Sequence, residues 1–143
     1  MKFFQFRLAT ALHHRELLLE IAQSELAQVL KKLDLAKALL SECNSSLKGF
    51  VDAAPVTGAQ FDPNHDLIRQ RHIYAIREEI DRRTAMIKQL TDLQQDKIAV
   101  VSAAHKDVRA MELLKEKEKA AWLLEVKRAE QKELDEYGSR KRS

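Results

Sequence analysis

The sequence has few residues that interrupt a helix, with only 3 Gly and 2 Pro among 143 residues. Aromatic residues make up 6% of the chain, which is too little to fill a large globular core. The remainder is rich in Ala, Leu, Glu, Lys and Arg, a composition typical of long helices and coiled coils. We therefore expect an all-α protein whose apolar side chains are buried along a narrow seam.

Three further scarcities limit the class of protein. The single cysteine, Cys43, excludes an internal disulfide and a cysteine-based zinc site, and indicates a reducing compartment. No apolar run approaches the ~20 residues of a membrane span, and Gln5 and Arg7 interrupt the apolar start, which makes it a poor signal peptide. The net charge is only +3, whereas a nucleic-acid binder usually shows a strong basic stripe. We expect a cytoplasmic protein with no membrane insertion and no nucleic-acid ligand.

Leucine recurs every seven residues through the first third of the chain, at Leu12, Leu19, Leu26, Leu33, Leu40 and Leu47. The positions that complete this heptad pattern are also apolar, except Arg15: Leu8, Ala22, Val29, Ala36, Cys43 and Phe50. A seven-residue apolar repeat drifts around a straight helix, so the helix supercoils to keep the repeat against a partner. The pattern predicts one strand of a coiled coil.

The helix-breaking residues cluster between 49 and 63, where the heptads stop: Gly49, Pro55, Gly58 and Pro63. Gly49 suits the left-handed conformation just past a helix end. Asp62 followed by Pro63 is typical of an N-cap with proline at the first helical position. The cluster predicts a connection over residues 49–62 between two helices.

After Pro63 and as far as Tyr137, the chain has neither Pro nor Gly. Apolar residues continue a heptad spacing there, at Ile73, Ile76, Ile80, Ile87, Leu90, Val101, Ala104, Val108 and Met111. We expect one domain, residues 1–143, that is an antiparallel coiled-coil hairpin with a longer second helix. Its parts are helix one at about 4–48, helix two at about 63–137 and a frayed tail at 138–143 that begins at Gly138.

Folding the helices back with Lys48 beside Pro63 predicts the register of the pairing. Leu12 then lies near residue 100 and the N-terminus near Met111. Residues from about 112 onward have no partner in this arrangement.

In the same register Arg15 lies opposite the stretch from Gln94 to Lys97, which is polar. Buried polar groups need partners. One interpretation is a polar layer in which Gln94 or Asp96 accepts a hydrogen bond from Arg15 and fixes the register. The alternative is that Arg15 simply reaches water.

No set of residues has the spacing of a catalytic, cofactor or metal site. Three scattered glycines cannot build a phosphate-binding loop. His13 and His14 are adjacent and point to different faces of a helix, while His65 and His72 are two turns apart. The carboxylates alternate with Lys and Arg at helical spacing, as on a solvated coiled-coil face. We expect no enzymatic activity and no cofactor.

The stretch from Ala120 to Leu124 is the strongest candidate for binding, because it holds the only tryptophan, Trp122. Five adjacent small or apolar residues cover more than one face of a helix, so part of this surface should be exposed. Tryptophan is enriched in interface hot spots. The alternative is that helix one or a second copy of the chain covers the stretch.

Short motifs at the two ends of the sequence resemble the FliJ family of flagellar type III export proteins. The first motif is Phe-Gln-Phe-Arg-Leu at residues 4–8, followed by Leu12 and Arg15. The second is Gln-Lys-Glu-Leu-Asp-Glu at residues 131–136. The length and the two long helices agree with this family.

The resemblance implies a central-stalk-like coiled coil that binds and stimulates a hexameric export ATPase. Its implied partners are the ATPase ring, the export-gate membrane protein and the export chaperones, at the cytoplasmic face of the inner membrane. Stalks of this kind present the end that bears both termini to the ring. The expected ATPase-binding residues are therefore Phe4, Phe6, Trp122, Leu123, Leu124, Gln131, Leu134, Asp135, Glu136 and Arg140. Two alternatives stay open: the equivalent stalk of a virulence secretion system, and a coiled-coil scaffold without an ATPase partner.

Overall fold

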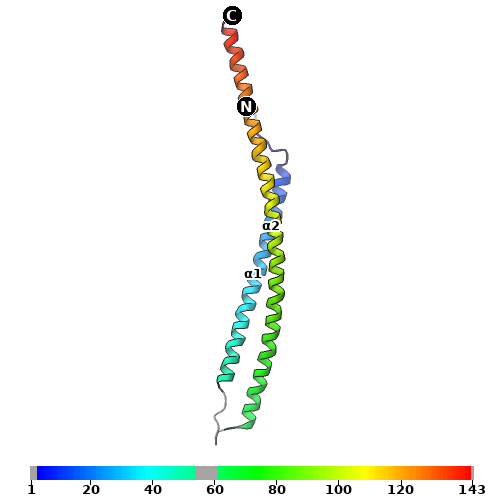
Figure 1. Ribbon diagram of the computed structural model, residues 1–143, viewed down its shortest axis with the longest axis vertical. Helices are drawn as coiled ribbons and strands as arrows, with labels where there is room; N and C mark the ends of the chain where they lie inside the picture. Colours follow the sequence, from blue (N-terminus) through cyan, green and yellow to red (C-terminus); the bar gives the residue numbers. More distant parts are fainter. Residues whose placement is uncertain (1–2, 54–60, 143) are drawn as a thin grey trace. The chain divides into compact units, whose positions relative to one another are not determined.

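The computed structural model describes residues 3–53 and 61–142, and these form two helices (Figure 1). Helix α1 spans Ala9–Asp52 and helix α2 spans Pro63–Arg142, with 44 and 80 residues. Neither described range contains a strand. This confirms the predicted all-α hairpin with a longer second helix. Pro55 and Gly58 of the predicted connection lie outside the described residues.

Helix α2 begins where the sequence predicts, with Asp62 as its N-cap. The Asn64 backbone N–H donates to Oδ1 of Asp62 over 3.0 Å, which satisfies a backbone donor that has no partner inside the helix. The Asp66 N–H then donates to the Asp62 carbonyl over 3.0 Å as the first helical hydrogen bond. Asp66 also places a negative charge in the first turn, where the helix dipole favours it.

Two glycines expected to end helices instead lie inside them. Helix α1 continues past Gly49 to Asp52, and α2 continues past Gly138 to Arg142, so the expected tail is helical up to that residue. A glycine inside a helix costs about 1 kcal/mol relative to alanine, which weakens a helix without stopping it. At Gly49 the next residue, Phe50, stacks on His72 of α2, with ring centroids 5.4 Å apart. That contact favours continuation of α1.

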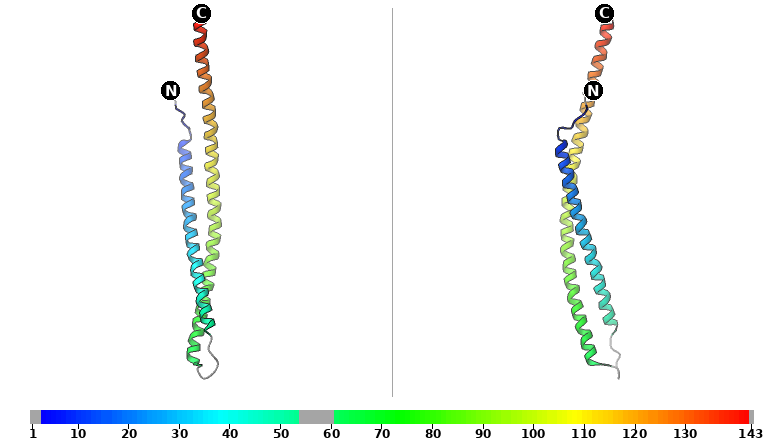
Figure 2. Two further views of the ribbon diagram at one scale, coloured as in Figure 1. Left: turned by 90° about the vertical axis from the view of Figure 1, so that its left-hand side faces the viewer. Right: turned by 180° about the vertical axis from the view of Figure 1, so that it is seen from behind.

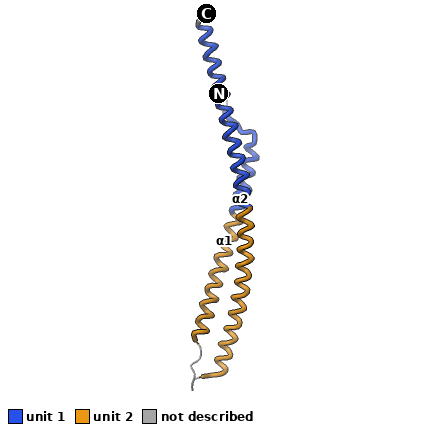
Figure 3. Tube along the Cα trace, viewed as in Figure 1, with its two compact units in different colours: residues 1–23, 100–143 blue, residues 24–99 orange. Residues whose placement is uncertain are grey.

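The chain forms two compact units (Figure 3). Unit 1 comprises Met1–Gln23 and Val100–Ser143, and unit 2 comprises Ser24–Ala99. In each unit α1 and α2 run side by side in opposite directions (Figure 2). In unit 1 Arg7 and Arg15 contact Glu118 and Asp107, respectively. In unit 2 Glu25 contacts Lys97.

The predicted heptad face of α1 packs against α2 in unit 2. Val29, Leu33 and Ala36 are buried, and Leu33 is only 4% exposed. The flanking seam residues are half-buried, namely Leu26, Leu40 and Leu47 on α1 with Ile73, Ile80 and Ile87 on α2. The polar residues Arg83, Gln94 and Lys97 are also half-buried. The face of α2 that packs on α1 therefore continues through these residues, although they are not apolar.

The same face forms the core of unit 1. Leu12 and Val108, each 7% exposed, belong to one buried cluster with Phe6. Ala22 is buried as well. The half-buried residues Leu8, Leu19, Met111 and Leu114 pack around the cluster, and Val101 is half-buried too.

The pairing of the helices differs from the expected register by about two to three turns. Leu12 packs with Val108 and not near residue 100, and Phe50 stacks on His72. The expected register set Lys48 beside Pro63, whereas the structure brings Phe50, near the end of α1, against Arg69 and His72 of α2. In unit 1, the part of α2 that pairs with the N-terminal part of the chain therefore extends beyond Met111.

The proposed polar layer of Arg15, Gln94 and Lys97 does not form as expected. Arg15 is exposed, and its Nη1 lies 3.3 Å from Oδ2 of Asp107. The Nζ of Lys97 lies 2.9 Å from Oε2 of Glu25. Long basic side chains pack their stems on apolar surface and extend their charges to the rim, so each pairs with a carboxylate at the edge of the seam.

Candidate partner-binding surface in unit 1

Residues 3–8 precede α1 and form a short non-helical segment, here called the N-terminal strap. It joins the helix through two backbone hydrogen bonds, from Ala9 N–H to the Phe6 carbonyl over 3.1 Å and from Leu12 N–H to the Leu8 carbonyl over 2.9 Å. A non-helical chain rises up to about 3.3 Å per residue, against 1.5 Å in a helix. The few strap residues therefore reach further along α2 than the same number of helical residues would.

Aromatic side chains of the strap cover α2. Phe6 is 7% exposed and belongs to the core cluster of unit 1. Phe4 is half-buried, and its ring centroid lies 5.9 Å from that of Trp122, with the ring planes at 51°. A tilted aromatic pair at this separation contributes about 0.5–1.5 kcal/mol beyond its area burial. Trp122 is thereby half-buried and not fully exposed.

One ion pair accompanies the aromatic contacts of the strap. The Nε of Arg7 lies 3.1 Å from Oε1 of Glu118, and the arginine side chain is 72% exposed. An ion pair this exposed stabilises a fold by about 0–1 kcal/mol. Most of what holds the strap is therefore the burial of Phe6, with Phe4 and Leu8 packed against the same core cluster.

Beyond Trp122, helix α2 continues through residues 123–142, here called the C-terminal extension. It projects past the N-terminal strap within unit 1 (Figures 1 and 2). Its large apolar side chains are exposed, with fractions of 45–65%: Leu123, Leu124, Leu134 and Tyr137. Leu123 and Leu134 lie on one face because eleven residues make about three helical turns, and Tyr137 adjoins them. These exposed apolar side chains are here called the apolar stripe; Lys127 and Glu130 lie on the same face between Leu123 and Leu134.

Polar groups flank this stripe. Nε2 of Gln131 donates to Oδ1 of Asp135 over 3.0 Å, and Nζ of Lys141 lies 5.5 Å from the centroid of the Tyr137 ring. Glu136 and Arg140 are exposed on the same extension. A rigid helix with an apolar stripe and charges of both signs at its border is suited to binding another protein.

The predicted binding residues thus fall into two groups. Phe4, Phe6 and Trp122 pack within unit 1, and the others lie exposed on the extension: Leu123, Leu124, Gln131, Leu134, Asp135, Glu136 and Arg140. The expected unpaired stretch from about residue 112 is wrong at its start, since the strap reaches Glu118 and Trp122. Phe4 partly covers Trp122, whereas Leu123 and Leu124 of the same stretch are exposed, so binding of a partner there stays a prediction.

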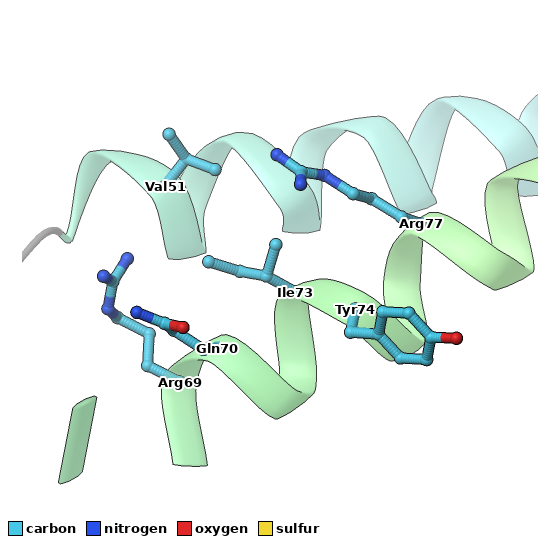
Figure 4. A pocket seen from close by; sticks show the side chains of 6 residues that line it. All are labelled: Val51, Arg69, Gln70, Ile73, Tyr74 and Arg77. Atoms are coloured by element: carbon cyan, nitrogen blue, oxygen red, sulfur yellow. The ribbon is translucent and has the colours of Figure 1, made fainter. Parts of the chain in front are cut away.

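Sequence reasoning missed a hollow of about 510 Å³ at the loop end of unit 2 (Figure 4). It is lined by Val51, Arg69, Gln70, Ile73, Tyr74 and Arg77. Arg69 donates to the Phe50 carbonyl over 3.0 Å, which ties α2 to the end of α1. A hydrogen bond with Glu78 raises the pKa of Tyr74. In the sequence, the spacing of Ile73 and Arg77 indicates only that they share a face of a helix, and it does not predict a hollow.

A second, smaller groove in unit 2 was also missed. It measures about 220 Å³ and is lined by Lys32, Leu35, Ala36, Leu39, Arg83, Met86 and Leu90. Leu35 and Met86 are 61% and 50% exposed at its border. Near this groove, hydrogen bonds from Arg82 and Arg83 lower the pKa of Glu79, with the Arg82 contact the larger cause. In the sequence, only the seven-residue spacing of Met86 and Leu93 could have indicated this groove.

Comparison with known proteins gives one family. The family model described as "Flagellar FliJ protein" matches residues 4–142, which is nearly the whole chain and includes the strap and the C-terminal extension. Neither the curated proteins nor the solved structures give a match. Within the described part of the chain, no helical stretch is apolar enough to cross a membrane. On the extent of the family match, the chain belongs to the flagellar FliJ protein family.

Proposed function

We propose that this protein is a central-stalk-like coiled coil that binds the hexameric flagellar export ATPase and stimulates it. Members of the FliJ family are non-catalytic, stalk-like components of flagellar export. The ATPase, the export gate and the export chaperones are the proposed partners, at the cytoplasmic face of the inner membrane. The flagellar match favours this function over the stalk of a virulence system.

The exposed apolar stripe of the C-terminal extension is the observation that carries the proposal. Leu123, Leu134 and Tyr137 keep 45%, 65% and 64% of their surface exposed on a single helix. Exposed apolar patches of this kind often mark protein–protein interaction sites. A helix that projects alone also fits the bore of a ring, because residues on all its sides can contact subunits.

Charge on the extension supports binding to a defined partner. Asp135, Glu136 and Arg140 are exposed on the same extension, and charges at the rim of an interface mainly set specificity and the association rate. The stripe itself would supply the contact area. Stimulation would follow from differential binding: a stalk that binds one arrangement of the ring more tightly shifts the ring toward it.

A titration of the purified cognate export ATPase tests the proposal. The full chain alone should hydrolyse no ATP, and increasing amounts of it should raise ATPase turnover and the ring population. Ring formation is followed by analytical ultracentrifugation in the same samples. Unchanged turnover and assembly across the titration would contradict the stalk function and favour a scaffold without an ATPase partner.

A further inference from the structure

The contact between the strap and Trp122 concerns the same surface as the proposed ATPase site. Trp122 is the only tryptophan of the chain, and it lies directly before the exposed Leu123 and Leu124 on a continuous helix. Phe4 covers part of its ring. The strap therefore covers part of Trp122, whereas the apolar residues next to it on the helix stay exposed. Tryptophan is the residue type most enriched in binding hot spots.

The strap is attached to α2 by side chains. Among the described residues, no backbone hydrogen bond joins residues 3–8 to α2, because those of Phe6 and Leu8 lead into α1. Attachment rests on the Phe4 and Phe6 rings and on the exposed Arg7–Glu118 pair. Segments with few buried contacts open at low free energy. Detachment of the first strap residues from α2 thus breaks none of the backbone hydrogen bonds described here.

Attachment also weakens toward the end of the strap. Phe6 is 7% exposed, Phe4 is half-buried, and Phe3 is 84% exposed. Phe6 is thus the anchor. Phe4 packs against the outside of the core cluster and is only half-buried, so opening can begin at Phe3, release Phe4 and stop at Phe6. Such a partial opening exposes Trp122 while Leu12 and Val108 remain packed.

We infer that residues 3–5 are a detachable cover on Trp122, and that the partner bound to the C-terminal extension displaces Phe4 and places its own apolar side chain on the indole ring. The inference rests on the proposed function. Displacement extends the partner's surface from Leu123 and Leu124 onto Trp122. The cover keeps a large aromatic surface from water in the free protein, and it makes binding compete with the strap.

This competition has a measurable cost in affinity. A binding-competent form that is only fractionally populated lowers the apparent affinity by that fraction. If Phe4 is closed in about nine-tenths of free molecules, removing its ring tightens binding by up to about tenfold. A Phe4 that instead contributes directly to the interface gives the opposite sign, since its loss weakens binding.

The experiment compares the full chain with Phe4→Ala and with Phe3→Ala as the matched control, since Phe3 is 84% exposed. Trp122 is the only indole fluorophore, so its emission and its quenching by acrylamide report on the cover. Phe4→Ala should shift the emission to the red and increase quenching, whereas Phe3→Ala should change neither. Unchanged emission in Phe4→Ala overturns the inference. Far-UV circular dichroism of each variant verifies that the helices remain.

The second measurement is the affinity of the same three chains for the cognate export ATPase. Phe4→Ala should bind about three- to tenfold more tightly than the unsubstituted chain, and Phe3→Ala should bind equally. Equal or weaker binding of Phe4→Ala overturns the displacement while the proposed function stands. Absence of binding by the unsubstituted chain overturns the proposed function and the displacement together, and the emission data then still decide whether Phe4 covers Trp122.

Discussion

Glu25 of α1 and Lys97 of α2 meet at the edge of the seam in unit 2, with Nζ of Lys97 2.9 Å from Oε2 of Glu25. The two residues are 72 positions apart in the sequence. A slip of one heptad would keep apolar residues facing one another but would part this pair. The contact therefore helps to specify the register that the heptads alone leave open.

A double-mutant cycle with Glu25→Ala and Lys97→Ala should reveal this contact. The side chains are 47% and 29% exposed, so the coupling free energy should be about 0.2–1 kcal/mol and should decrease with salt. Urea unfolding at low and high ionic strength measures it. A cycle on Arg15 and Gln94, the pair expected from the sequence, is the control, and coupling there but not at Glu25–Lys97 would restore the register expected from the sequence.

Leu33→Ala should destabilise the hairpin by about 2–5 kcal/mol, because Leu33 is 4% exposed and its loss leaves a cavity in the seam. Leu35→Ala makes the same chemical change two residues away, at a side chain that is 61% exposed. It should change the free energy of unfolding by about 0.5 kcal/mol or less. Chemical denaturation of both variants measures the difference, and equal losses would mean that the seam lies on another face.

Asp62→Ala should remove the N-cap of α2 and lower stability by about 0.5–2 kcal/mol, since Oδ1 no longer accepts from the Asn64 N–H. Asp62→Asn should restore most of the loss, because an amide oxygen also caps a helix. Hydrogen exchange of the first amides of α2 localises the effect. If both variants match the unsubstituted chain, the capping hydrogen bond does not contribute to stability.

The helices and the apolar face of each could be predicted from the sequence, because a seven-residue repeat of apolar residues places them on one side of a helix. Leu12, Leu33 and Val108 belong to the predicted heptads, and all three side chains are buried. The register could not be predicted in the same way, since every slip by a heptad matches leucine with isoleucine equally well.

The binding surface was predictable only in part. Exposure of Leu123 and Leu134 followed from their place near the end of the longer helix. The cover on Trp122 did not, because residues 3–8 are not helical and have no period that indicates where Phe4 lies. The strap's reach along α2 depends on its non-helical backbone, which the motif at residues 4–8 does not reveal.

Leu134→Ser should weaken binding to the cognate export ATPase by about tenfold, which corresponds to about 1.4 kcal/mol, if Leu134 is part of the contact area. Its matched control is Leu35→Ser, an equally polar change at a similarly exposed leucine in unit 2, where the fractions are 65% and 61%. Neither should alter thermal stability appreciably. A larger loss of affinity for Leu35→Ser would place the ATPase contact in unit 2.

The most direct test of the central claim is the affinity of the export ATPase for a chain that ends at Val126. This truncation removes most of the C-terminal extension and keeps the Phe4–Trp122 and Arg7–Glu118 contacts. A binding titration and a thermal melt are run on the same sample. We predict at least about a tenfold loss of affinity, about 1.4 kcal/mol, with the hairpin still folded. Undiminished affinity of the truncated chain would contradict the claim that the ATPase binds the C-terminal extension.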